Sequence, residues 1–155
     1  MDKTITTALL IMAGIVSMVF VFNSVFPMIN RSTQAMTSMS DKIDDRMKSR
    51  VSIVHAANTT DRHTVYIWVK NIGSSRIVAI EDSDLFFGQE GNFYRITYGG
   101  TDYPRWSYTV EGGTDWETGN TIKITIVYDS DPGAGTYFAK FIVPNGILDE
   151  YYFSM

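Results

Sequence analysis

Hydrophobic residues fill the first part of the chain almost without interruption. No charged residue lies between Lys3 and Arg31, and residues 8–22 are apolar apart from Gly14 and Ser17. A helix over residues 5–26 would be about 33 Å long, enough for a hydrocarbon core of about 30 Å. A signal peptide is the rival interpretation, but no small-residue cleavage site follows the run. The pattern therefore favours a helix that enters a membrane.

The helical pattern continues beyond the apolar run. Residues 30–50 contain neither glycine nor proline, and Met36, Met39, Ile43 and Met47 recur at three- and four-residue steps. This spacing predicts one narrow apolar stripe along a helix. The stripe packs either on the chain's own second part or on neighbouring helices, and methionine adapts to varied partners.

One helix from about residue 4 to about residue 50 accounts for both segments. Pro27 lies inside it and lacks the N–H that a helix interior needs, so we expect a kink or local unwinding there. A lone helix of this length is typical of membrane-embedded or coiled arrangements.

After residue 50 the hydrophobic period changes to two. Val65, Ile67 and Val69 alternate with more polar residues, as strands do. Strand-like runs separated by turn residues cover 65–69, 77–81, 85–87, 92–98, 106–110, 122–126, 136–143 and 150–153. We predict an α+β chain in which a long hydrophobic helix, residues 1–50, precedes an all-β immunoglobulin-like sandwich, residues 51–155, as in type IV pilin-like filament subunits.

Charge and composition follow the same division. Residues 1–50 hold six basic and four acidic side chains and seven of the eight methionines. Residues 51–155 hold seven basic and thirteen acidic side chains, with every tyrosine and tryptophan of the chain. The sequence shows no basic stripe, so nucleic acid is not an expected partner. The chain has no cysteine and therefore no disulfide or thiolate metal site.

Candidate chemistry is sparse. His55 and His63 stand in no known motif, and no nucleotide-binding, hydrolase or zinc-protease signature occurs. Two Asp-Ser-Asp triplets, 82–84 and 129–131, lack the later glutamate of a calcium loop. We therefore expect no enzyme, no catalytic residue, no metal site and no cofactor. Asn58 begins an Asn-Thr-Thr sequon and is a candidate for glycosylation on an extracellular domain.

Nine short stretches in order carry a resemblance to a known family. They are residues 4–11, 43–46, 68–75, 83–88, 93–96, 106–108, 135–138, 144–146 and 149–154. Over nearly its whole length the chain resembles the archaellum protein G family (FlaG/ArlG), which is related to archaellins and to type IV pilin-like subunits. The chain differs from archaellins in the Asp2-Lys3 pair that precedes its apolar run, and whether a leader is cleaved stays open. It differs from bacterial pilins in having Ile5 where they generally place glutamate.

The resemblance implies a structural component of the archaellum, the rotating motility filament of archaea. It implies a cytoplasmic-membrane protein whose β domain is extracellular, at the cell surface, and contacts an archaellum F-type protein and the surface-layer protein, so that the motor is anchored. Membrane lipid is the expected partner before assembly, and a helical filament of identical copies is the expected homo-oligomer.

Three interpretations remain open from the sequence. The chain is either the anchoring component or an archaellin or pilin subunit of the external filament itself. A membrane-anchored extracellular β-sandwich that binds a surface ligand is the third interpretation.

Helix-to-helix packing would use the apolar residues of the first fifty positions. The predicted assembly residues are Ala8, Leu9, Ile11, Met12, Ile15, Met18, Val19, Phe22, Phe26, Met36, Met39, Ile43 and Met47.

Overall fold

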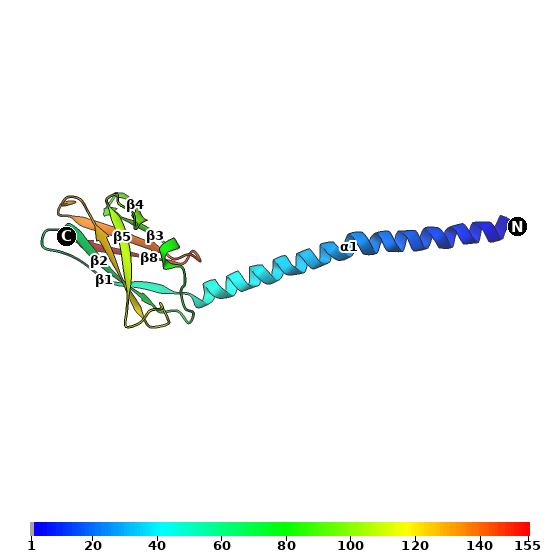
Figure 1. The fold of residues 1–155 in the computed structure, drawn as a ribbon, viewed down its shortest axis with the longest axis horizontal. Helices are drawn as coiled ribbons and strands as arrows, with labels where there is room; N and C mark the ends of the chain where they lie inside the picture. The colour runs from blue at the N-terminus through cyan, green and yellow to red at the C-terminus, as the bar shows by residue number, and fades with distance from the viewer. Residues whose placement is uncertain (1) are drawn as a thin grey trace. The chain divides into compact units, whose positions relative to one another are not determined.

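The computed structural model describes residues 2–155, which form one long α-helix, one 3₁₀ turn and eight strands (Figure 1). The elements are α1 (Asp2–Lys48), β1 (Val51–Asn58), β2 (Thr64–Asn71), η1 (Ile80–Asp82), β3 (Asp84–Gln89), β4 (Asn92–Tyr98), β5 (Arg105–Glu111), β6 (Thr121–Val127), β7 (Thr136–Ile142) and β8 (Leu148–Ser154). The predicted fold class, a long helix followed by an all-β sandwich, is confirmed.

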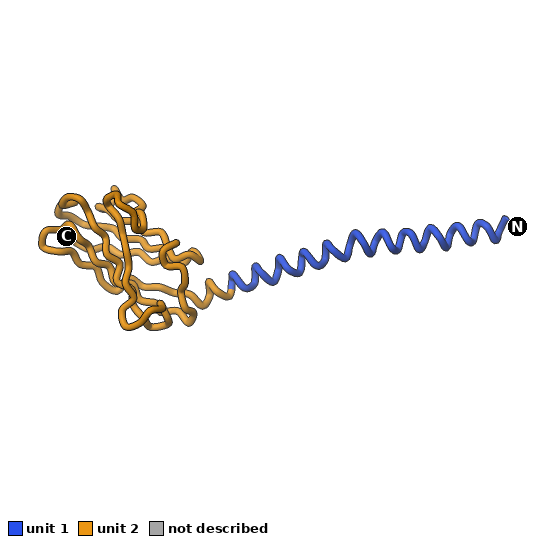
Figure 2. Tube along the Cα trace, viewed as in Figure 1, with its two compact units in different colours: residues 1–43 blue, residues 44–155 orange. Residues whose placement is uncertain are grey.

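The chain divides into two compact units, and the division falls within the helix (Figure 2). The first unit ends at Ile43, and the second runs from Asp44 to Met155. The last turn of α1 therefore belongs to the sandwich unit, whereas the sequence pattern placed the boundary at residue 50. The helix continues without a break across Pro27.

The sandwich is one eight-stranded sheet folded onto itself. Its strand order is β1-β2-β6-β5-β4-β3-β7-β8, and every neighbouring pair is antiparallel except β4 and β5. The two end strands, β1 and β8, approach each other, and the backbone N–H of Ile53 donates to Asp149 Oδ2 at 2.7 Å. This bond links the two edges of a nearly closed sandwich.

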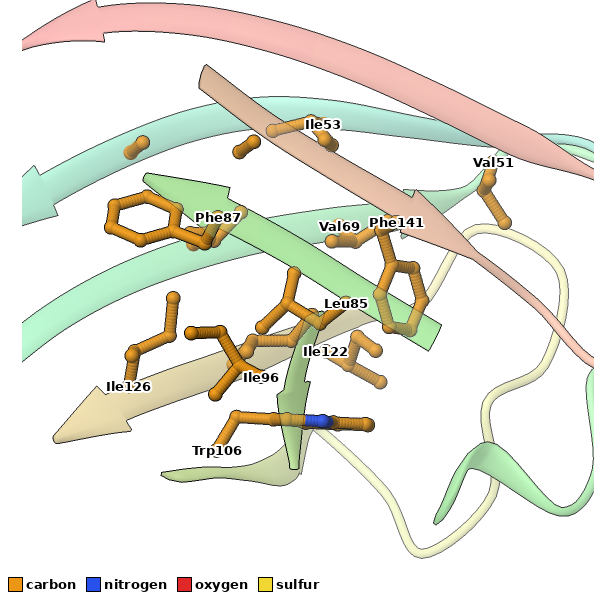
Figure 3. Close-up of a cluster of buried hydrophobic side chains, with 14 of the residues drawn as sticks. Val51, Ile53, Val69, Leu85, Phe87, Ile96, Trp106, Ile122, Ile126 and Phe141 are labelled. Atoms are coloured by element: carbon orange, nitrogen blue, oxygen red, sulfur yellow. The ribbon is translucent and has the colours of Figure 1, made fainter. Parts of the chain in front are cut away.

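Alternate residues of the strands fill the core between the two layers (Figure 3). Ile67, Ile124 and their neighbours at every second position of β2 and β6 are fully buried, and so are Leu85, Phe87 and Phe141 of β3 and β7. Trp106 packs edge-on against Phe141, with ring centroids 5.9 Å apart. The period of two seen in the sequence is thus the period of burial.

One predicted strand was wrong, and one strand of the structure was not predicted. Residues 77–81 do not form a strand: Ile77 makes a single bridge to Trp116, and Ala79 has φ 54°, a left-handed conformation that ends an extended segment. Strand β1 was not among the predicted runs. Its register shifts between Ile53 and His55, and this bulge breaks the alternation that sequence patterns rely on.

The last turn of α1 is held by the loop that follows β2. The backbone N–H of Ser74 donates to the carbonyl of Lys48 at 2.8 Å, and the N–H of Gly73 donates to Arg50 at 3.0 Å. The first bond satisfies a carbonyl that the helix end leaves unpaired, and the second holds the carbonyl of the loop residue Arg50. A Cβ on Gly73 would overlap the Lys48 carbonyl oxygen and the backbone of Arg50. Only glycine permits this close approach.

We therefore predict that Gly73→Ala lowers the free energy of unfolding by about 2 kcal/mol. The added methyl group would force the backbone of Lys48 and Arg50 to move. Gly113→Ala is the matched control, since its Cβ would lie 3.6 Å from the Asn120 side chain, an ordinary contact. Thermal unfolding of both full-length variants in detergent, followed by near-UV circular dichroism, measures the difference. Equal stability of the two variants would contradict the close approach.

Candidate functional site

The most extensive candidate site is the apolar surface of α1. Every residue from 2 to 43 is exposed in the single chain. The large hydrophobic side chains between residues 5 and 29 have exposed fractions of 45% to 71%. Burying one such side chain is worth roughly 1.5–3 kcal/mol, so this surface strongly favours an apolar environment. By length and composition the helix is able to cross a membrane.

The first part of α1 is apolar on all sides rather than along one stripe. At about 100° per residue, the predicted assembly residues from Ala8 to Phe26, Leu9 excepted, fall within one third of the circumference. Leu10, Val16, Phe20 and Val21 lie outside that third and are equally exposed. A helix that is hydrophobic all round is typical of burial in lipid or among other helices.

Two threonine hydroxyls at the start of this segment are satisfied locally. Thr6 Oγ1 donates to the carbonyl of Asp2 at 2.7 Å, and Thr7 Oγ1 donates to that of Lys3 at 2.8 Å. Such bonds to the preceding turn lower the cost of placing a hydroxyl away from water. Phe22 and Phe26 stack one turn apart, with ring centroids at 5.7 Å.

The second part of α1 carries the predicted methionine stripe. Met36, Met39, Ile43 and Met47 are exposed by 75%, 65%, 48% and 82%. They lie within about 80° of the helix circumference, and the other residues of 30–48 are polar except Ala35. The stripe is therefore an uncovered apolar seam of the width that pairs two helices.

The other predicted positions lie apart from this surface. Asn58 is the last residue of β1, is half-buried, and donates to the carbonyl of Thr59 at 3.1 Å. His55 stacks on Trp68, and His63 lies against Asp61 in the loop after β1.

The second Asp-Ser-Asp triplet is held by protein groups. The N–H of Gly133 donates to the carboxylate of Asp131, and this bond, with the Arg62 guanidinium, holds the pKa of Asp131 below its usual range. Among residues 2–155, no three His, Asp or Glu side chains are grouped so as to hold a metal ion.

Comparisons with known proteins agree with this architecture. The family model of archaeal-type flagellins matches residues 5–153. An uncharacterized protein of Archaeoglobus fulgidus is 27% identical over 161 residues, which span 98% of each chain.

Two solved structures are also similar. The archaellum periplasmic stator protein FlaG from Sulfolobus acidocaldarius has 26% identity and a TM-score of 0.62, and the match covers 68% of this chain and 99% of that one. A chain of the archaellum periplasmic stator protein complex FlaF and FlaG, from the same organism, has 28% identity and a TM-score of 0.59. That match covers 66% of this chain and 87% of the other.

The resemblance to the archaellum protein G family is thereby confirmed. The protein is a FlaG-like structural protein associated with the archaellum, and this membership, rather than any missing motif, excludes an enzyme. With its helix and its sandwich both matched by one family model, the chain belongs to the archaeal-type flagellin family.

Proposed function

We propose that this protein is a membrane-inserted subunit that assembles through α1 into a helical filament and anchors the archaellum motor at the cell surface. The single observation that carries the proposal is the exposed apolar surface of residues 5–29. Lipid covers that surface before assembly, and the helices of other copies cover it afterwards. The same residues then serve two environments of similar polarity.

The anchoring role is supported by the relatives. One similar structure is named a periplasmic stator protein, and the other is a stator complex of FlaF and FlaG. We therefore place the sandwich outside the cytoplasmic membrane, with an F-type archaellum protein as its partner and the surface layer as its attachment. Packing along α1 uses the assembly residues predicted from the sequence, with Pro27 as the site where the helix bends.

The methionine stripe supplies the first test. Met39→Asp with Ile43→Asp should abolish filaments after detergent removal while leaving the sandwich folded, because two carboxylates in an apolar seam lose their solvation. Electron microscopy measures assembly, and near-UV circular dichroism measures folding.

Gln34→Asp with Ser38→Asp is the matched control for the stripe. It adds the same two charges at the same spacing, on the opposite side of the helix. Filaments should persist in this control. If the Met39 and Ile43 variant still assembles as the wild type does, the helix-core model is wrong.

Removal of the apolar run supplies the second test. A fragment of residues 31–155 should leave the membrane fraction and form short assemblies or none, since it lacks the surface that lipid and neighbouring helices cover. Membrane fractionation and electron microscopy of fragment and full chain check this. Long native-like filaments from the fragment would contradict the role given to residues 5–29.

The same measurements separate the alternatives. Isolated particles of full-length protein, which bind the F-type partner but never polymerise, would indicate a membrane-anchored binding module. Filaments of unlimited length without any partner would indicate an external filament subunit.

A further inference from the structure

The outer face of strands β1, β2, β6 and β5 differs in charge from the rest of the sandwich. Lys70 and Trp68 of β2, Lys123 of β6 and Arg105 of β5 occupy outward positions, because each alternates along its strand with a core residue. In the register of the sheet, Trp68 lies between His55 of β1 and Lys123. We call the outward residues His55, Tyr66, Trp68, Lys70, Arg105 and Lys123 the basic face.

Basic residues away from this face are neutralised within the chain. Four ion pairs hold them: Arg62 with Asp131 at 3.0 Å, Arg76 with Asp115 at 3.3 Å, Lys140 with Glu150 at 2.9 Å, and Arg95 with Asp84. These four are all the basic residues of 51–155 outside the basic face.

The three cations of the basic face have no such partner. Among the described residues, no carboxylate lies within 4.0 Å of Lys70, Lys123 or Arg105 in an ion pair. The unit has two further arginines without a carboxylate, Arg46 in the last turn of α1 and Arg50 in the short loop between α1 and β1. Every uncompensated cation of the eight strands is thus gathered on one sheet face.

Carboxylates avoid the same face. Of the thirteen acidic residues in 51–155, only Glu111 occupies an outward position on these four strands. It accepts a hydrogen bond from the indole N–H of Trp68 at 3.1 Å. The rest of the sandwich carries four basic and twelve acidic residues. One domain therefore presents a positive face and a negative remainder.

Aromatic rings lie among the cations. His55 stacks on Trp68 with ring centroids 5.4 Å apart, Tyr66 lies 6.0 Å from Trp68, and Lys123 Nζ lies 5.6 Å from the centre of the Tyr66 ring. Tryptophan, tyrosine and arginine are the residues most often found at the energetic centre of protein interfaces. Both the charge and the aromatic content point to a protein partner with an acidic surface.

We propose that the basic face docks against the acidic surface of a second copy of this chain, in a head-to-tail contact between sandwiches. The proposal rests on the assembly described above and names the surface through which the sandwiches meet. A symmetric contact between two basic faces would set like charges against each other, which costs energy. A contact between different surfaces of identical copies instead repeats from copy to copy, which gives a closed ring or an open filament according to its rotation.

Charge reversal tests the contact in full-length protein. Lys70→Glu with Lys123→Glu should raise the concentration needed for filaments about tenfold, and added salt should weaken wild-type assembly, since screened charges attract less. Arg76→Glu with Arg95→Glu changes the net charge equally and breaks only exposed ion pairs, each worth about 1 kcal/mol or less. This control should change the required concentration less than threefold. Equal effects of the two variants would overturn the proposal.

A crosslinking experiment separates this contact from polymerisation itself. Unlabelled and ¹⁵N-labelled full-length copies are mixed in detergent and treated with a carbodiimide, which joins a lysine to a carboxylate in contact with it. We expect crosslinks between copies from Lys70 or Lys123 to carboxylates outside the basic face, whereas Lys140 should couple to Glu150 of its own chain.

The possible outcomes test polymerisation and the head-to-tail contact separately. If wild-type protein forms no filaments yet gives these crosslinks, polymerisation fails and the head-to-tail contact stands. If filaments form but Lys70 and Lys123 crosslink to no second copy, the contact is wrong and polymerisation stands. Crosslinks that arise only when the F-type protein is added would assign the basic face to that partner and overturn a second copy.

Discussion

A single helix cannot cover its own apolar surface, and for α1 this constraint governs the rest of the molecule. No described residue of the helix is buried, and its first part is hydrophobic on every side. Water is a poor environment for such a surface, so the helix belongs in lipid or among other helices. The β domain that follows carries thirteen acidic and seven basic side chains, which favour water. The helix and the β domain therefore favour different environments, as the difference between their compositions indicates.

Apolar packing alone does not choose a partner. Lipid tails are as apolar as leucine, so helices in a membrane gain little from hydrophobicity when they meet. Direction and register must come from surfaces that lipid cannot imitate. The chain offers two: the narrow methionine stripe from residue 36 to residue 47, and the basic face of the sandwich. The methionine stripe has the width of a contact between two helices. The basic face has the charge that would bind an acidic surface.

Local patterns predicted the elements, and contacts between distant segments decided what was missed. The helix, its stripe and most strands follow from periods of 3.6 and 2 in the sequence. Strand β1 was not predicted, because its bulge at Val54 interrupts the alternation of buried and exposed residues. Gly73 contacts Lys48, which lies far from it along the chain, and no local sequence pattern predicts this contact. The basic face could not be predicted from local patterns either, because ion pairing depends on which carboxylates the fold brings near each lysine.

An open filament requires subunits whose two contacting surfaces differ. A helix that is apolar on all sides supplies attraction without such a difference, because every side resembles every other. The sandwich breaks this equivalence. Its unpaired cations lie on one sheet face while unpaired carboxylates, such as Asp82, Glu90 and Asp129, lie elsewhere. Under the proposed contact, identical copies attract head to tail and repel face to face, and the polarity of the assembly follows from the distribution of charge.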